Sequence, residues 1–296
     1  MGKTMPFGDH FYRSSDGELT LYARDYASSG PAVLLMHGLT RNSADFEGLA
    51  SALGGQYRLI VPDQRGRGRS QWDADPARYR PDIYAQDMLA LLDSLQIDRV
   101  AAIGTSMGGI IAMLMAATQR ERLSALVLND VGPEVSAEGL SRISSYVGET
   151  GPFASWAEAA DACRRQNAVA LPDYSDAQWL RFAQRLCTQR PDGTIAFAYD
   201  PAIAKPLANG ESTDAPDLWP LWSALDALPI LTVRGASSDI LSAETARRMG
   251  AEHSGPFELA EIAGRGHAPM LDEPAATRAI TGFLKKYAQS AHPAHA

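Results

Sequence analysis

Hydrophobic residues recur along this chain in two patterns, short continuous apolar runs and longer segments with helical spacing. The apolar runs have the length of strands, and one of them, residues 32–36, is apolar at every position, which is typical of a parallel strand covered on both faces. The pattern predicts strands over 32–36, 57–61, 100–103, 123–128, 230–233 and 257–262, and helices over 44–53, 83–95, 110–117, 243–249 and from 274 to about 288. This alternation of strands and helices predicts a parallel sheet with crossover helices.

Two parts of the chain depart from the alternation. The turn residues 14–17 separate two short stretches of strand character, which predicts an antiparallel hairpin at a sheet edge. Residues 131–226 contain no long apolar strand and are helix-like pieces interrupted by Gly and Pro. We therefore expect residues 1–130 and 227–296 to form one core, with a helical cap of residues 131–226 inserted over the carboxyl ends of the strands. Residues 290–296 have the character of a frayed tail.

Composition narrows the possible functions. The 296 residues are 45% hydrophobic and 21% charged, which suits an enzyme with a sizeable core. The formal net charge is −8 and no Lys/Arg block is present, so we expect no nucleic-acid partner. No apolar run approaches the roughly 20 residues that span a bilayer, and the first residues lack the apolar stretch of a signal peptide. We expect a monomer or homodimer that acts on a small molecule without contact with a membrane.

The two cysteines, Cys163 and Cys187, have neither metal-site spacing nor the density of a disulfide scaffold. We therefore expect free thiols, a cytoplasmic location, and neither a metal nor another cofactor.

The strongest chemical signal is Gly-Thr-Ser-Met-Gly at 104–108, between the predicted strand 100–103 and the apolar helix 110–117. In this strand–turn–helix context, Gly-x-Ser-x-Gly is typical of an exposed nucleophile. The turn is so tight that Ser106 must adopt a strained backbone, and side chains at 104 or 108 would collide with neighbouring backbone. Ser106 is therefore the predicted nucleophile.

A serine hydroxyl needs a base to take its proton, and a carboxylate to orient that base. Of the six histidines, His267 lies in the loop directly after the last predicted strand, so it reaches the sheet edge that carries Ser106. Two aspartates follow neighbouring strands, Asp239 in the loop after 230–233 and Asp130 directly after 123–128. Both satisfy the order Ser, Asp, His. We predict Asp239 as the acid, with Asp130 as the alternative.

Negative charge develops on the substrate carbonyl oxygen during attack, so two hydrogen-bond donors should face it. The backbone N–H of Met107, the residue after the nucleophile, supplies one donor. The loop after strand 32–36 supplies the other at Leu39.

The set of motifs resembles the α/β-hydrolase superfamily. The residues that carry the resemblance are His37-Gly38, the Asp-x-Arg-Gly-x-Gly-x-Ser segment 63–70, Gly-x-Ser-x-Gly-Gly at 104–109, Asp239, and Gly266-His267. The resemblance implies an α/β fold with a mostly parallel eight-stranded sheet flanked by helices and a helical cap after strand six. It also implies that segment 63–70 is chiefly a structural turn.

Single positions narrow the reaction within that family. The resemblance also places Ser106 at the position where haloalkane dehalogenases and epoxide hydrolases of this fold use an aspartate. This difference argues against both activities. Thr105 replaces the Asn that is usual in carbon–carbon bond hydrolases, and Leu39 replaces the Trp that is usual in perhydrolases. We predict hydrolysis of a carboxylic ester or lactone. The alternatives are carbon–carbon bond hydrolysis of ring-cleavage dienoates, amide or thioester cleavage, and, as a non-enzyme, a ligand receptor on a hydrolase scaffold.

Substrate contacts are less marked in the sequence. Trp156 and Trp179 in the predicted cap are candidates to line an apolar pocket, although cap tryptophans equally serve to attach the cap to the sheet. Arg41, close after the oxyanion loop, is a candidate to bind a substrate carboxylate, with a salt-bridged surface role as the alternative.

Overall fold

A computed structural model describes residues 5–208 and 217–288 of the chain, so the predicted frayed tail lies outside the described residues. The strands are β1 (Gly8–Arg13), β2 (Thr20–Tyr26), β3 (Ala32–Met36), β4 (Arg58–Asp63), β5 (Val100–Thr105), β6 (Leu123–Asn129), β7 (Cys187–Gln189), β8 (Ile195–Phe197), β9 (Ile230–Gly235) and β10 (Phe257–Ile262). The α-helices are α1 (Glu47–Leu53), α2 (Pro81–Ser94), α3 (Met107–Thr118), α4 (Ala137–Ser144), α5 (Trp156–Asn167), α6 (Asp176–Leu186), α7 (Lys205–Ala208), α8 (Trp219–Ser223), α9 (Ala243–Glu252) and α10 (Pro274–Tyr287). Short 3-10 helices cover Ser43–Phe46, Pro76–Arg78, Arg120–Arg122 and Pro201–Ala204.

Eight strands form one sheet in the order β1-β2-β4-β3-β5-β6-β9-β10. Strand β2 is antiparallel to both of its neighbours, whereas every pair from β4 to β10 is parallel. The predicted parallel sheet and the predicted edge hairpin, β1–β2, are therefore both confirmed. Because the parallel strands point the same way, the loops that follow β3, β5, β6, β9 and β10 meet at one edge of the sheet.

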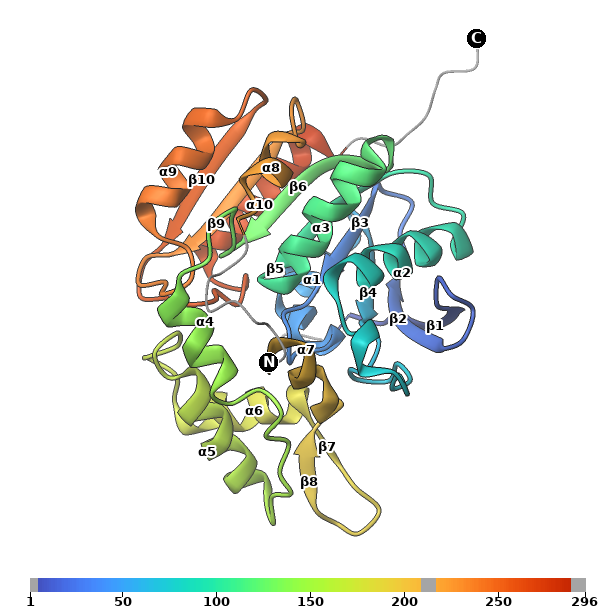
Figure 1. The fold of residues 1–296 in the computed structure, drawn as a ribbon, viewed down its shortest axis with the longest axis vertical. Coiled ribbons are helices and arrows are strands. Elements are labelled where there is room, and N and C mark those ends of the chain that lie inside the picture. Colours follow the sequence, from blue (N-terminus) through green and yellow to red (C-terminus); the bar gives the residue numbers. More distant parts are fainter. Residues whose placement is uncertain (1–4, 209–216, 289–296) are drawn as a thin grey trace.

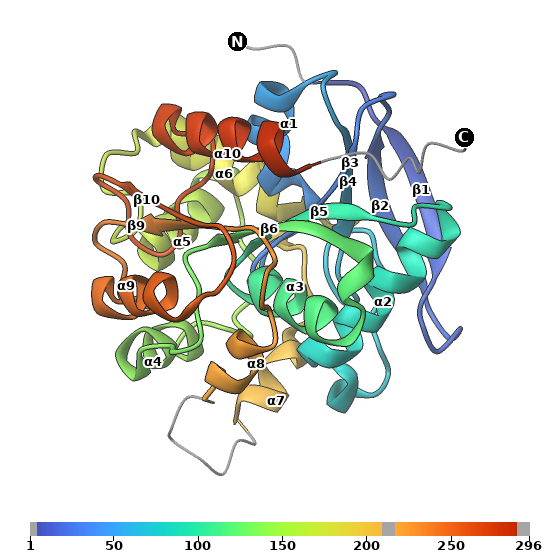
Figure 2. The same cartoon turned by 90° about the horizontal axis from the view of Figure 1, so that it is seen from above.

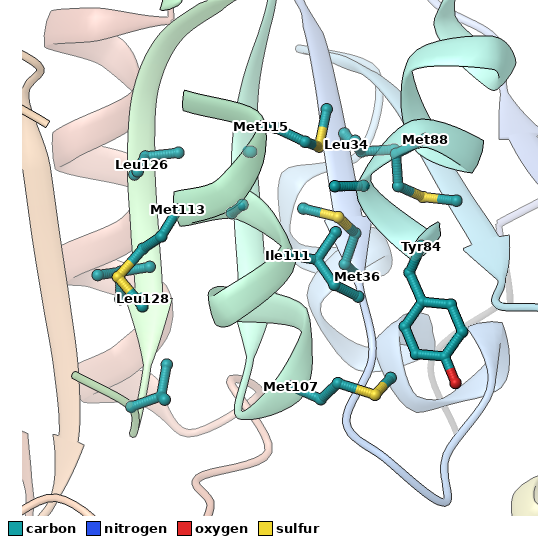
Figure 3. Packing of buried hydrophobic residues seen from close by; sticks show 14 of the residues in the cluster. Leu34, Met36, Tyr84, Met88, Met107, Ile111, Met113, Met115, Leu126 and Leu128 are labelled. Atoms are coloured by element: carbon teal, nitrogen blue, oxygen red, sulfur yellow. The ribbon is translucent and has the colours of Figure 1, made fainter. Parts of the chain in front are cut away.

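Helices cover both faces of the sheet, with α1 and α10 on one side and α2, α3 and α9 on the other (Figure 2). Each layer buries its own hydrophobic cluster against the strands. Helix α3 is apolar on all sides because it lies between the sheet and other helices, and Met113, Met115 and Ile111 fill the space beside β3, β6 and α2 (Figure 3). In the described ranges, no helix has the length and apolarity needed to cross a bilayer.

Between β6 and β9 the chain forms α4 to α8 and the short antiparallel hairpin β7–β8. The hairpin and α4 to α7 gather at the carboxyl ends of the sheet strands, whereas α8 lies beside α3 (Figure 1). Local sequence sets where these helices begin: the hydroxyl of Ser155 caps α5, and Ser175 and Gln178 form a capping box at α6. Backbone contacts also attach this segment to the core, since the N–H of Gly266 donates to the carbonyl of Ala170 at 3.0 Å. It therefore covers the loops in which the candidate site residues lie.

Segment 63–70 forms a buried polar turn after β4. The guanidinium of Arg65 is fully buried and is paired with Asp87 and Asp73 at 2.7 Å each. The carboxylate of Asp63 accepts hydrogen bonds from the backbone N–H groups of Ser43 at 2.6 Å and Arg69 at 2.8 Å. These pairs hold the loop after β4 against α2 and against the 3-10 helix Ser43–Phe46, which agrees with the expected structural role.

His37 joins the loop after β3 to the loop after β4. Its Nδ1 lies 2.7 Å from the carbonyl oxygen of Gly38, and its Nε2 lies 3.0 Å from the backbone nitrogen of Gln64, which donates to it. This pattern requires a neutral ring with its proton on Nδ1. Burial lowers the pKa of His37 to about 3, so the ring in the folded protein is neutral at pH 5 and above.

This arrangement predicts a loss of stability in mild acid. In the unfolded chain His37 regains its ordinary pKa and takes up a proton below about pH 6.5, whereas in the folded protein it does not, so the free energy of unfolding decreases as the pH falls. Between pH 7 and pH 5, His37 contributes about 2 kcal/mol to this decrease. In His37→Gln that contribution is absent, so the variant should be less pH-sensitive than the wild type by this amount. Urea denaturation of both proteins at pH 5 and pH 7 measures the difference, and equal pH sensitivity would contradict a neutral, buried His37.

Candidate active site

The turn between β5 and α3 holds Ser106 in a strained conformation, with φ 52° and ψ −118°. The close packing expected from the glycines is present. A Cβ atom at Gly104 would lie 2.2 Å from the carbonyl oxygen of Gly108, and one at Gly108 would lie 2.1 Å from that of Met36. Only glycine fits both positions, and the turn they allow places the Ser106 hydroxyl at the sheet edge, before the N-terminus of α3.

Ser106, His267 and Asp130 form a continuous chain of contacts. The Oγ of Ser106 lies 2.9 Å from Nε2 of His267, and Nδ1 of the same ring lies 2.8 Å from Oδ2 of Asp130. The imidazole side chain is 8% exposed and the carboxylate is fully buried. A carboxylate only accepts hydrogen bonds, so the ring carries its proton on Nδ1 and leaves Nε2 free to accept from the serine.

Two further donors hold the Asp130 carboxylate in place. Its Oδ1 accepts from the backbone N–H of Gly235 at 2.7 Å, and its Oδ2 accepts from the hydroxyl of Ser238 at 2.5 Å. Both donors lie at the end of β9 or in the loop beyond it. The buried charge is therefore compensated by hydrogen bonds from β9 and from His267, as a buried carboxylate requires.

Asp239, our predicted acid, does not contact His267, and the contact we expected for it is made by Asp130. Asp130 directly follows β6 and turns toward the ring with φ 58°. Asp239 lies four residues beyond the end of β9, and its carboxylate accepts two hydrogen bonds from the Arg142 guanidinium of α4, at 2.5 and 3.0 Å. Burial alone would raise the pKa of Asp239, but its hydrogen bonds to Arg142 and the charge of that residue outweigh burial and lower the pKa. Asp239 thus joins the α4 segment to the core.

The two predicted oxyanion donors lie beside Ser106. The side chains or backbone of Leu39 and Met107 line the same cavity as Ser106. Among the described residues, neither of their backbone N–H groups donates a hydrogen bond to another residue. Both donors are therefore free to bind an oxygen atom in the cavity.

The cavity over Ser106 has a volume of about 390 Å³ and is largely apolar. The segment between β6 and β9 provides one wall of it, from residues that the sequence analysis did not identify: Val135, Leu140, Ile143, Ile203, Pro206 and Leu218. Leu140 and Ile143 lie three residues apart in α4, and this helical spacing was the available signal. Within the described ranges, no group of three or more His, Cys, Asp or Glu side chains is arranged to hold a metal ion.

The three residues predicted to contact the substrate do not line the cavity over Ser106, because their side chains pack against other residues. The guanidinium of Arg41 stacks 4.3 Å from the ring centre of Phe182 and pairs with Asp45 at 3.4 Å. Trp179 is buried against Tyr174 and Phe182, and Trp156 packs against the core cluster. None of the three lines the cavity over Ser106, and Trp179 packs against aromatic residues of its own segment.

Comparison with known proteins adds to this geometry. The family model described as alpha/beta hydrolase fold matches residues 31–245. The chain is 37% identical to a 3-hydroxybutyrate-oligomer hydrolase of Cupriavidus necator, over 83% of this chain and 86% of the relative. It is 30% identical to a 2-(acetamidomethylene)succinate hydrolase of Mesorhizobium japonicum, over 79% and 81% respectively. A crystal structure of an alpha/beta hydrolase from Novosphingobium aromaticivorans is 46% identical, with a TM-score of 0.88, over 95% of this chain and 98% of that one.

The geometry predicts that the nucleophilicity of Ser106 depends on Asp130 and not on Asp239. Asp130→Asn should slow phosphonylation of Ser106 by a fluorophosphonate about a hundredfold or more, because the amide no longer stabilises the charged imidazole. Asp239→Asn loses only a partly exposed ion pair, so its rate should stay within about threefold of the wild type. Intact-protein mass spectrometry follows the labelling, and circular dichroism checks that both variants are folded. A larger effect from Asp239→Asn would restore Asp239 as the acid.

Proposed function

The chain belongs to the α/β-hydrolase family, and we propose that it is a serine hydrolase that cleaves a carboxylic ester or lactone through an acyl-enzyme on Ser106. The observation that carries this proposal is the chain of hydrogen bonds from Ser106 through His267 to Asp130, at 2.9 and 2.8 Å. Such a chain activates a hydroxyl at neutral pH, because the imidazole takes the proton as the oxygen attacks.

The proposed reaction has two symmetrical halves. Ser106 Oγ attacks the substrate carbonyl carbon while Nε2 of His267 takes the hydroxyl proton, and the same proton then passes to the departing alkoxide. Water replaces the alcohol, gives its proton to Nε2, and attacks the acyl carbon, which releases the carboxylic acid and returns the proton to Ser106. Asp130 stabilises the imidazolium at each stage and keeps the ring oriented, without itself becoming protonated.

The backbone N–H groups of Leu39 and Met107 are the proposed donors to the oxyanion of the tetrahedral intermediate. Their lack of other acceptors among the described residues supports this role. Each donor of this kind lowers the barrier by about 3 kcal/mol, because it is already oriented where negative charge develops. The N-terminus of α3 adds a favourable partial charge at the same place.

The more similar of the two relatives described above, the 3-hydroxybutyrate-oligomer hydrolase, supports the ester assignment. A 3-hydroxybutyrate oligomer joins the hydroxyl of one unit to the carboxyl of the next, which is an ester bond, and the protein of that name is 37% identical to this chain. A cavity of about 390 Å³ lies in the size range of small-molecule sites and fits a short acyl chain with a short alcohol. Amide cleavage is the second candidate, because the other relative is named for a substrate with an acetamido group.

We propose that residues 131–226 act as a cap on a core of residues 1–130 and 227–296. The apolar side chains of α4 and its neighbours form one wall of the cavity, so changes in this segment would alter substrate preference and leave the Ser106–His267 contact in place.

Removal of either reacting side chain should abolish ester hydrolysis. We expect Ser106→Ala and His267→Ala each to lower kcat for 4-nitrophenyl butyrate by roughly ten-thousandfold or more, because the nucleophile and base act as a unit. A colorimetric assay measures the loss, with thermal unfolding as the check on folding. Trp156→Phe, which alters the same segment away from the cavity, is the matched control and should retain activity. Substantial turnover by Ser106→Ala would contradict an acyl-enzyme at this residue.

The bond that is cleaved can be assigned by competition among substrates. We expect the value of kcat/KM to be highest for short esters and for the linear dimer of 3-hydroxybutyrate, and much lower for a 2-hydroxy-6-oxo-dienoate or a 4-nitroanilide. Chromatography of the products from each substrate under identical conditions gives the ranking. A preference for the dienoate would assign carbon–carbon hydrolysis, and a preference for the anilide would assign amide cleavage.

A further inference from the structure

Arg67 carries a buried positive charge without a carboxylate partner among the described residues. Its side chain is fully buried, and it forms no ion pair in the described ranges, whereas neighbouring Arg65 is paired with three aspartates. The nearby carboxylate of Asp200 is bound to the hydroxyl of Tyr79 and the N–H of Ala202. Because an isolated charge is costly to bury, a cation in this position calls for an anion close by.

The hydrogen bonds of Arg67 leave part of its guanidinium unused. Its Nε donates to the carbonyl of Leu39 at 2.9 Å, and its Nη1 donates to the carbonyl of Arg65 at 2.8 Å and to the hydroxyl of Tyr84 at 2.7 Å. Among the described residues, its Nη2 donates only to the thioether of Met107, a weak acceptor, at 3.9 Å. Nη2 thus lies beside Met107, whose backbone N–H is one of the two predicted oxyanion donors.

The Tyr84 hydroxyl accepts from Arg67, so its own proton must point elsewhere. Among the described residues, this hydroxyl donates to no acceptor. Burial raises the pKa of Tyr84, although the Arg67 charge opposes this, so the phenol is neutral and keeps its proton. A hydroxyl that accepts from a cation is a stronger donor, because each bond of the chain polarises the next.

The position of Tyr84 makes this donor available to a ligand. Tyr84 and Ser106 line the same cavity, whose other walls are mostly apolar. The Tyr84 side chain extends from α2 toward the end of the sheet where Met107 begins α3, with its oxygen at that end (Figure 3). On the basis of the proposed hydrolase function, we propose that the Tyr84 hydroxyl, which faces the cavity and is polarised by the buried Arg67 behind it, binds a carboxylate, so that the substrates of this protein are esters that carry a free carboxylate.

Two other roles for the pair make different predictions. If Arg67 only anchors the Leu39 loop, its loss would lower the turnover of charged and neutral esters equally. If the Tyr84 hydroxyl binds the reacting carbonyl oxygen, its loss would also act on every ester. Only a carboxylate subsite discriminates between an acid and a neutral substrate of the same shape.

The test compares acids with their primary amides, which have nearly the same shape but no charge. One pair is the linear dimer of 3-hydroxybutyrate and its terminal amide, and the other is 4-nitrophenyl hydrogen glutarate and its amide. For at least one pair, wild-type kcat/KM should favour the acid about tenfold or more, the range for a hydrogen bond to a charged group. Tyr84→Phe and Arg67→Met should each reduce this ratio to near one, mainly through a higher KM for the acid.

Tyr12→Phe is the matched control. It removes the hydroxyl of another buried tyrosine, which has no hydrogen-bond partner among the described residues and lies in β1 away from the cavity. The ratio should not change in this variant. A wild-type ratio near one for both pairs, or an equal loss for acid and amide in Tyr84→Phe, would overturn the subsite. If Arg67→Met does not fold, the Tyr84→Phe result decides.

Equilibrium binding separates the subsite from the proposed reaction. In Ser106→Ala, calorimetric titration with the 3-hydroxybutyrate dimer should give a Kd that rises about tenfold when Tyr84→Phe is added. This result would stand even if the wild type failed to hydrolyse esters or to react with a fluorophosphonate, which would contradict only the proposed function. An unchanged Kd would contradict the subsite alone.

Discussion

The buried carboxylate of Asp130 is the point at which three loops of the sheet are joined. It follows β6, accepts hydrogen bonds from Gly235 and Ser238 beyond β9, and contacts His267 beyond β10. A charge without solvent must be compensated by donors in defined positions, so the carboxylate constrains all three loops together. This constraint sets the position of the imidazole. Its Nδ1 is bound to Asp130, so its Nε2 faces Ser106.

A second set of polar contacts holds the opposite side of the site. His37 joins the loops after β3 and β4, Arg65 is paired with aspartates from other segments, among them Asp87 of α2, and Arg67 binds the carbonyl of Leu39. These groups are buried beneath a cavity with mostly apolar walls. Polar contacts thus fix the positions of the loops around Ser106 and His267, while the segment that contains α4 provides apolar side chains to the cavity wall. The two kinds of interaction come from different parts of the chain.

Local pattern accounts for most of the fold. Short, mainly apolar runs predicted six of the sheet strands, because a strand covered on both faces needs hydrophobic residues at most positions. The turn at 14–17 predicted the β1–β2 hairpin, and the interrupted texture after Asp130 predicted a helical segment between β6 and β9. The pattern missed the short hairpin β7–β8, because three-residue strands have too few positions to show a period.

The site was predictable where backbone geometry or strand order decides it. Gly104, Ser106 and Gly108 were recognisable because the turn admits no other residue at the glycines, and His267 because its loop follows the last parallel strand. The residues that line the cavity were not predictable in this way. Trp179 was predicted to line a pocket because of its size, yet it packs α6 against neighbouring residues, and smaller aliphatic residues line the cavity.

The sequence by itself determined the sheet, the nucleophile turn and the set of loops that meet at one edge, because these depend on local periodicity, glycine and chain order. Only the tertiary structure decided which of two aspartates faces the imidazole. Asp130 and Asp239 follow neighbouring strands, and nothing within either segment distinguishes them. The difference arises because Arg142, far away in sequence, draws Asp239 toward α4, whereas Gly235 and Ser238 hold Asp130 against His267.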